Sequence, residues 1–160
     1  MQGSYYDTAL VCTSGHTVNN SAESWPAHNS PYCEKCGAKT MDTCPKCQQK
    51  IRGEYHVPGV VNLTVKTAPP RFCHHCGEPY PWTESSLNAA REYIRELDGL
   101  DDNERGIMSR SLDDLVRDTP NSNVAVLRFK KLAAKVGLEA WKGLKEIIIR
   151  VVTEGIAKQL

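Results

Sequence analysis

The chain of 160 residues carries 20 basic and 19 acidic side chains, so its formal net charge of +1 at pH 7 gives no strong overall field. Its composition changes near Trp82. Residues 1–83 hold all seven cysteines but only 10 of the 33 Val, Ile, Leu and Phe residues. The first part therefore lacks the aliphatic mass for a core of its own, whereas the second part has it. We expect an α+β chain, with a metal-held domain over 1–82 and a helical domain over 83–160.

No segment of the sequence resembles a targeting signal or a membrane span. Met1–Leu10 lacks a basic start followed by an apolar stretch, and the longest aliphatic run, Ile147–Ile149, is far shorter than the ~20 residues that a span needs. These features predict a cytoplasmic protein without membrane contacts. Because thiols stay reduced in that compartment, the cysteines favour zinc over disulfides, which would also leave one of the seven unpaired.

Soft metal ligands stand in closely spaced pairs along residues 1–82. In chain order the pairs are Cys12/His16, Cys33/Cys36, Cys44/Cys47 and Cys73/Cys76. Eight ligands are enough for two closed tetrahedral zinc ions. A lone histidine such as His16 is usually a surface residue, but a turn glycine precedes it and the first ion needs a fourth ligand.

The spacing of the pairs predicts how the two ions share them. Only seven residues separate Cys36 from Cys44, which suits a strand between consecutive zinc ribbons. A sequential arrangement then gives the first ion Cys12, His16, Cys33 and Cys36, and the second ion Cys44, Cys47, Cys73 and Cys76. The alternative is the cross-braced pairing of RING-type domains, in which the first pair joins the third and the second joins the fourth.

Turn residues near the pairs are typical of zinc knuckles. Gly37 and Gly77 each follow a second cysteine, where glycine adopts positive φ while backbone N–H groups point at the thiolates. In the turn from Cys44 to Cys47, we expect the proline to fix the geometry instead. The segment Val57–Val65 alternates apolar and polar residues near its ends and predicts short antiparallel strands.

The ligand pattern favours structural zinc over catalytic zinc. A catalytic ion keeps one position open for water, whereas each predicted ion is saturated by protein ligands. The sequence contains no His-Glu-x-x-His motif, no deaminase-type pair of His-x-Glu and Pro-Cys-x-x-Cys, no glycine-rich phosphate loop and no Gly-x-Ser-x-Gly elbow. We therefore expect no enzymatic activity.

The second part predicts three to four helices. The first has Thr83 as N-cap, with Trp82 before it packing on Leu87, and ends at Gly99. A second covers about 102–117, and a third has Thr119 as N-cap and Pro120 at its first position. The expected inward positions are Leu87, Ala90, Ile94 and Leu97, then Met108, Leu112 and Leu115, then Ala125, Phe129, Leu132 and Val136.

The last predicted helix runs from Leu138 to near the end of the chain, and much of its circumference is apolar. Its apolar positions are Trp141, Leu144, Ile147, Ile148, Ile149, Val151, Val152 and Ile156. This pattern fits either a central helix of one bundle or a helix that also packs on a second copy or a partner.

Charge is segregated within the helical part, with a net charge of −5 over 84–118 and +5 over 119–160. Either the two halves complement each other within one bundle, or the basic half binds phosphates. The candidate phosphate-binding residues are Arg128, Lys130, Lys131, Lys135, Lys142 and Lys145.

Several stretches also carry a resemblance to a known family. They include Tyr6-Asp-Thr-Ala-Leu-Val-Cys12, Cys33-x-x-Cys-Gly-Ala-Lys-Thr40, Tyr55-His-Val-Pro-Gly59, Cys73-x-x-Cys-Gly-x-Pro-Tyr-Pro-Trp82 and Leu112-Asp-Asp-Leu-Val-Arg-Asp-Thr-Pro120. In these stretches the chain resembles a bacterial family of unknown function with tandem N-terminal zinc ribbons and a C-terminal helical region. The resemblance implies a bacterial origin and zinc at the eight ligand positions. It does not point to any particular activity.

Two classes of function remain open. The first is a zinc-binding adaptor whose ribbons present Trp25, Tyr55, His56 and Pro58, while the helices form a homodimer or dock a protein partner. The second is a nucleic-acid-binding accessory factor that uses the basic face of residues 128–145. A ubiquitin-ligase-like RING module is less favoured, because it requires the cross-braced pairing.

Overall fold

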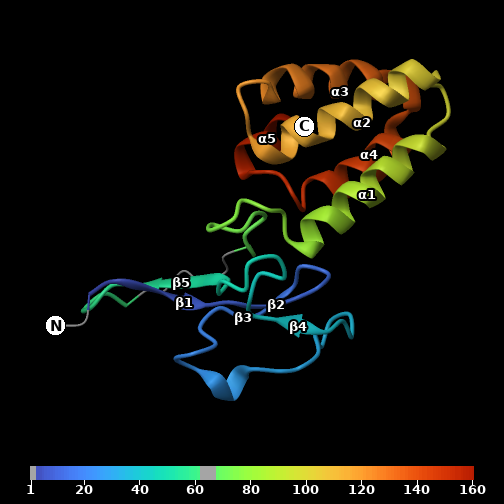
Figure 1. Ribbon diagram of the computed structural model, residues 1–160. Helices are drawn as coiled ribbons and strands as arrows, with labels where there is room; N and C mark the ends of the chain where they lie inside the picture. Colours follow the sequence, from blue (N-terminus) through green and yellow to red (C-terminus); the bar gives the residue numbers. More distant parts are fainter. Residues whose placement is uncertain (1–2, 62–67) are drawn as a thin grey trace. The chain divides into compact units, whose positions relative to one another are not determined.

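The structure of the chain is a computed structural model, which describes residues 3–61 and 68–160. The chain divides into two compact units, residues 1–84, here the ribbon unit, and residues 85–160, here the helical unit. Short antiparallel strands lie in the first unit and helices dominate the second (Figure 1), so the predicted α+β fold class is confirmed. Among the described residues, no helix combines the length and apolar character needed to cross a membrane.

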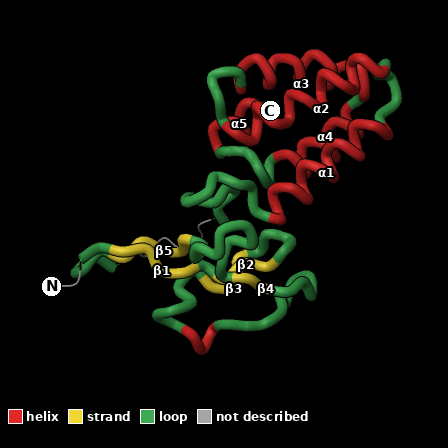
Figure 2. The backbone as a smooth tube through the Cα atoms, in the orientation of Figure 1, coloured by secondary structure: helices red, strands yellow, loops and turns green. Residues whose placement is uncertain are grey.

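The described part of the ribbon unit contains two small antiparallel sheets, connected by long loops and turns (Figure 2). One pairs β1 (Tyr5–Thr8) with β5 (Arg52–His56), in a register that places Tyr5 opposite His56 and Tyr6 opposite Tyr55. The other has the order β3-β2-β4, formed by Thr17–Asn19, Leu10–Cys12 and Thr40–Met41. A 3-10 turn, η1 (Pro26–His28), lies in the loop between β3 and β4.

The predicted strands are only partly found. β4 lies in the segment between Cys36 and Cys44, where the spacing predicted a strand. The prediction over Val57–Val65 is wrong for 57–61, because β5 ends at His56 and the Val60 N–H donates to the Val57 carbonyl in a turn, at 3.1 Å. Pro58 and Gly59 explain that turn, since proline fixes φ and Gly59 adopts a φ of +79°. Residues 62–65 of the prediction lie outside the described residues.

The core of the ribbon unit is small and contains cysteines among its apolar side chains. It consists of Ala9, Val11, Cys44, Ile51, Cys73, Tyr80 and Trp82, all buried. Backbones approach closely beside this core, because a Cβ added at Gly53 would lie 2.1 Å from the carbonyl oxygen of Asn20. Only glycine fits at that position.

A buried carboxylate organises the loop that follows β3. Asp7, which is 2% exposed, accepts backbone N–H groups from Thr8 at 2.6 Å, Glu23 at 3.1 Å and Ser24 at 3.2 Å. Burial opposes ionisation of this side chain, but the hydrogen bonds from Ser24, Glu23 and Thr8 outweigh burial and lower its pKa. The carboxylate therefore fixes the end of β1 to a loop some sixteen residues further along the chain.

The first helix, α1 (Pro81–Glu96), begins earlier than predicted. Pro81 occupies the first helical position, which suits proline because the missing N–H would have no partner there. Thr83 is therefore not the N-cap, and its hydroxyl donates instead to the carbonyl of Arg71, at 2.8 Å. Trp82 lies inside the first turn and packs in the ribbon core rather than standing before the helix as a staple.

The second helix, α2 (Asp102–Arg117), has the predicted bounds. It begins with a capping box that was not predicted from the sequence. Asp101 accepts the N–H of Glu104, and Glu104 accepts the N–H of Asp101 in return. The third helix, α3 (Ser122–Val136), starts later than predicted. Pro120 belongs to a turn, in which the Ser122 N–H donates to the Thr119 carbonyl at 2.9 Å.

The predicted last helix is interrupted, so α4 (Leu138–Ile148) and α5 (Glu154–Gln159) replace it. Thr153 caps α5, because its hydroxyl accepts the N–H of Ile156 at 3.3 Å. The run of β-branched residues from 147 to 153, interrupted only by Arg150, also weakens helix propensity at this point. The single continuous helix was therefore a wrong prediction.

The helical unit has a conventional apolar core. Its buried residues include Leu87, Ala90 and Ile94 from α1, Leu97 just after α1, Met108, Leu112 and Leu115 from α2, Ala125 and Phe129 from α3, and Leu144 and Ile148 from α4. These positions confirm most of the predicted inward faces, while Leu132 and Val136 are half-buried. Close contacts accompany the packing, since a Cβ at Gly143 would lie 2.2 Å from the Tyr93 hydroxyl oxygen.

Candidate metal centres

Three Cys-x-x-Cys turns of the ribbon unit share one backbone geometry. In each turn the residue after the second cysteine donates its N–H to the carbonyl of the first cysteine, and the first cysteine donates its own N–H to the carbonyl one residue further on. The first set of bonds joins Gly37 to Cys33, Gln48 to Cys44 and Gly77 to Cys73, at 2.8, 2.9 and 2.9 Å, and the second joins Cys33 to Ala38, Cys44 to Gln49 and Cys73 to Glu78, at 2.9, 2.8 and 2.8 Å. The sequence repeat is therefore also a structural repeat.

The residue after the second cysteine has positive φ in all three turns. Gly37 and Gly77 have φ values of +69° and +75°, as the sequence predicted. Gln48 occupies the same place in the Cys44–Cys47 turn with a φ of +62°. Proline therefore does not replace the left-handed residue in that turn, and a side chain with a Cβ adopts a conformation that usually favours glycine.

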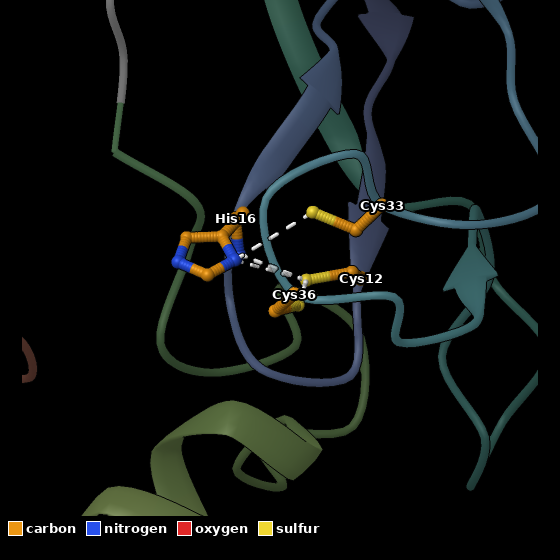
Figure 3. Close-up of side chains that lie close together, drawn as sticks. All are labelled: Cys12, His16, Cys33 and Cys36. Carbon is orange, nitrogen blue, oxygen red and sulfur yellow. Dashed lines mark hydrogen bonds between the residues drawn. The ribbon is translucent and has the colours of Figure 1, made fainter.

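The first ligand group is built from the end of β2, the turn after it and the next Cys-x-x-Cys turn. It contains Cys12, His16, Cys33 and Cys36, whose ligand atoms all lie within 4.8 Å of one another. Their side chains converge on one point (Figure 3), with the His16 Nδ1 atom 3.6 Å from the sulfurs of both Cys12 and Cys33. The Cys12 and Cys36 sulfurs are 3.7 Å apart.

The second ligand group brings together two Cys-x-x-Cys turns that are far apart in the sequence. It contains Cys44, Cys47, Cys73 and Cys76, again within 4.8 Å of one another. The sulfur of Cys44 lies 3.8 Å from that of Cys76, and the sulfur of Cys47 lies 3.7 Å from that of Cys73. In both groups the structure brings together the sequential set of residues, and no described group combines the first pair with the third as a cross-brace requires.

These distances fit a tetrahedral metal site. With zinc–sulfur bonds of about 2.3 Å, two sulfurs of a tetrahedron lie about 3.8 Å apart, and a sulfur and an imidazole nitrogen about 3.6 Å apart. The corresponding separations in the structure are 3.7 to 3.8 Å and 3.6 Å. A disulfide needs sulfurs at about 2.05 Å, and all seven cysteines are free. The two groups are therefore positioned to bind metal ions.

Backbone N–H groups favour the thiolate form in both ligand groups. The N–H of Ala38, with the Ser14 hydroxyl, lowers the pKa of Cys36 to about 6. Burial opposes ionisation of Cys73, but the N–H groups of its own turn, together with hydrogen bonds from the Cys47 and Cys76 thiols, outweigh burial and lower the pKa to about 6. The His16 N–H also points at the Cys12 sulfur, at 3.2 Å, although burial outweighs this hydrogen bond and raises the pKa of Cys12. Such donors stabilise the negative charge that a thiolate brings to a metal.

Crowding acts in the other direction within the second group. The N–H of Gln49 favours the Cys47 thiolate, yet burial and the adjacent sulfurs of Cys76 and Cys73 outweigh it and raise the pKa of Cys47 to about 12. Several thiolates at one point repel each other unless a cation lies between them. A divalent ion would displace the remaining protons, which is the usual linkage between thiolate ligands and zinc.

Four residues near the ligands have roles that the sequence analysis did not predict. Ser14 and Gln48 act through the turns, while Tyr80 and Trp82 stack on each other with ring centroids 4.7 Å apart. The Tyr80 hydroxyl is buried and has no hydrogen-bond partner within the part of the chain that the structure describes. Burial, and then the nearby Cys73 sulfur, raise the pKa of Tyr80, so the hydroxyl keeps its proton. The aromatic pair Tyr80-Pro-Trp82 was the available signal in the sequence.

The six basic residues predicted as a phosphate-binding face do not form one uniform surface. Lys135 forms an ion pair with Glu104, and Lys142 pairs with Glu139 at 3.0 Å. Arg128, Lys130 and Lys131 are exposed on α3, and no described carboxylate lies within ion-pair distance of them. Lys145 is half-buried on α4.

Comparison with known proteins gives one match. Residues 5–160 match the model of a family described as an uncharacterized protein conserved in bacteria (DUF2321). The chain belongs to this family. The match confirms the bacterial family that the sequence motifs suggested, over nearly the whole chain. No curated protein and no solved structure matches the chain.

Proposed function

We propose that this member of the DUF2321 family is a non-enzymatic interaction protein whose ribbon unit is held together by two structural zinc ions. The observation that carries the proposal is the tetrahedral spacing of two complete groups of four ligand atoms. Cys12, His16, Cys33 and Cys36 would hold one ion, and Cys44, Cys47, Cys73 and Cys76 the other. Zinc suits these ligands because thiolates and imidazole are its preferred donors in closed tetrahedral sites.

The completeness of both groups supports a structural role for the ions. Catalytic zinc needs an open position where water can bind, and here four protein ligands occupy each tetrahedron. Sulfur-rich coordination also leaves an ion electron-rich and therefore a weak Lewis acid. The ions would instead cross-link segments that are far apart in the sequence, for example those of Cys44 and Cys73.

Exposed apolar side chains on the helical unit support a protein partner. Val124 and Leu127 of α3 are 46% and 54% exposed, and they lie one helical turn apart on the same side of the helix. Arg128 and Lys131 follow within the next turn, so apolar and basic groups alternate along the exposed side. A surface of this kind fits a partner with apolar and acidic groups, or a second copy of the chain.

The ribbon unit offers further exposed aromatic groups. Trp25 is 62% exposed, and Tyr55 on β5 is 48% exposed beside Tyr6. Aromatic side chains with a polar tip are enriched in protein interfaces. These groups support the adaptor proposal, in which each unit contributes a separate contact surface.

A nucleic-acid-binding role is the second candidate, and exposed Arg128, Lys130 and Lys131 favour it. The acidic residues paired with Lys135 and Lys142 weaken it, because they reduce the positive field. Fluorescence polarisation of zinc-loaded protein with random DNA and RNA, across a salt series, separates the two. Micromolar binding whose log affinity falls linearly with log salt would replace the adaptor proposal, and no binding at low salt would remove the nucleic-acid role.

The adaptor proposal has its own test in the helical surface. We would compare affinity capture from lysate of the source bacterium by the wild-type chain, by Leu127→Glu and by the matched control Lys158→Glu, whose side chain is also exposed. The proposal expects one protein, or the chain itself in sedimentation velocity, to bind wild type and control but not Leu127→Glu. If Leu127→Glu and the control capture the same proteins and self-associate to the same extent, the α3 contact is refuted.

A further inference from the structure

Two stacked aromatic rings follow the second ligand group in the sequence, Tyr80 just before α1 and Trp82 in its first turn. Tyr80 and Trp82 are 1% and 4% exposed, and their planes are inclined by only 15°. Both belong to the ribbon unit and to its core cluster. Proline between them restricts the backbone, so the two rings are held as one element.

Tyr80 packs in the same buried cluster as two cysteines of the second ligand group. Its ring lies in the same buried cluster as Cys44 and Cys73, and its N–H donates to the Arg71 carbonyl at 3.0 Å, just before the Cys73 turn. Its hydroxyl is buried without a described partner. The position of the ring is therefore defined by contacts with the segment that carries the Cys73–Cys76 turn.

Trp82 reaches the first ligand group. A Cβ added at Gly15 would lie 2.8 Å from the Trp82 Cβ and 3.1 Å from its Cγ, so the indole side chain packs against the turn that carries His16. Gly15 has a φ of +86°, and its N–H donates to the Cys12 carbonyl at 2.8 Å. The indole Nε1 in turn donates to the Pro70 carbonyl at 2.9 Å, in the segment that leads to Cys73.

We propose that the Tyr80–Trp82 ring pair couples the two metal sites, so that an ion bound in either group raises the affinity of the other group. The inference rests on the proposed binding of zinc by both groups. An empty second group leaves the 70–80 segment without its cross-link, and Trp82 then loses the support that holds it against Gly15. The first group must then order its turn alone, which costs conformational entropy and weakens its ion. The coupling is reciprocal, because it is a free energy shared by two sites.

The coupling is measurable by titrating each site in the presence and absence of the other. Cys44→Ser/Cys47→Ser disables the second group, and Cys33→Ser/Cys36→Ser disables the first. Cobalt(II) serves as the probe, because a site with three sulfurs and one nitrogen and a site with four sulfurs absorb differently, and zinc affinities follow from competition with a chromophoric chelator. We expect disabling either group to weaken the other by about tenfold, within the usual range for coupled sites.

Variants at the ring pair test whether the rings carry the coupling. Trp82→Ala should reduce the tenfold ratio to near one, and Trp82→Phe should keep part of it, because a ring remains while the bond to Pro70 is lost. Trp141→Phe, in α4, is the matched control and should leave the ratio unchanged. Circular dichroism of each variant checks that the helical unit is folded.

Each outcome bears on a different claim. A wild-type chain that binds no zinc or cobalt refutes the proposed function. If the chain binds two ions, and the affinity of each site is the same whether or not the other group is intact, the coupling is refuted. The proposed function then still stands. If Trp82→Ala weakens both sites while the tenfold ratio persists, the ring pair has only a structural role and the inference is overturned.

Discussion

In the helical unit, large side chains fill the core: Met108, Leu115 and Phe129 are each 0% exposed. In the ribbon unit, the buried cluster holds few aliphatic residues and two cysteines, and the remaining buried positions include Cys12 and Cys33. The helical unit can therefore obtain its stability from apolar burial, whereas the ribbon unit needs cross-links between its turns. With zinc bound as proposed, the two units would reach a folded state by different chemistry, and each unit should respond to its own perturbation.

Removal of metal is expected to have the largest effect, and only on the ribbon unit. Structural zinc contributes roughly 10–16 kcal/mol in small peptides at neutral pH, which is comparable with the whole stability of a domain. With excess chelator, we expect the ribbon amide resonances to lose their dispersion in two-dimensional NMR spectra while the α-helical circular dichroism persists. Ribbon resonances that survive complete chelation would contradict the comparison, as would simultaneous melting of the helices.

A cavity in the apolar core is expected to affect the helical unit alone. Phe129→Ala should lower the free energy of unfolding of that unit by about 3–5 kcal/mol, because it removes a buried ring. Leu127→Ala is the matched control on the same helix and should change it by less than about 0.5 kcal/mol. Urea denaturation followed by circular dichroism gives both values. Loss of bound metal in Phe129→Ala would show that the two units do not respond separately.

The Asp7 carboxylate should be the strongest polar contribution within the ribbon unit. Asp7→Asn replaces one acceptor oxygen by an NH₂ group that faces backbone donors, and should destabilise the metal-loaded unit by about 1–3 kcal/mol. Because the folded-state pKa of Asp7 lies below its unfolded value, this stabilisation is present at neutral pH and is lost as the pH falls through the folded pKa. Denaturant unfolding at pH 7 measures it, with exposed Asp42→Asn as control. Equal stability of the two variants would be evidence against this role.

The smallest predicted effect is a gain in stability at Gln48. Gln48→Gly should stabilise the metal-loaded ribbon unit by about 1 kcal/mol, because glycine adopts a φ near +62° without the strain of a Cβ. The reverse change at the equivalent position, Gly77→Gln, should cost a similar amount. The measurement is the denaturant midpoint of ribbon resonances at saturating zinc. A loss of stability in Gln48→Gly would mean that the side chain makes a contact that outweighs the strain.

The ligand groups were predictable because their chemistry is local in the sequence. A Cys-x-x-Cys turn fixes two ligands within four residues, and the short Cys36–Cys44 spacing suggested the sequential sets that the structure brings together. The long helices were also predictable, since periodic apolar residues such as Met108 and Leu112 mark their inward faces.

The remaining features depend on contacts between distant residues or on turn details. The pairing of β1 with β5 joins Tyr5 to His56, and neither strand has a strong local pattern. The local sequence predicts that Trp82 precedes a helix, but the side chain packs against Gly15 and lies in the ribbon core. The break between α4 and α5 depends on the Thr153 cap and on the β-branched run before it, in a stretch whose apolar pattern is continuous.

Native mass spectrometry of the metal-saturated chain tests the central claim most directly. The account predicts two zinc ions for each wild-type chain, one in Cys33→Ser/Cys36→Ser and one in Cys44→Ser/Cys47→Ser, all measured at zinc concentrations well above both dissociation constants. A wild-type chain that holds one ion or none under these conditions would contradict it, because the two ligand groups would then not be the cross-links of the ribbon unit.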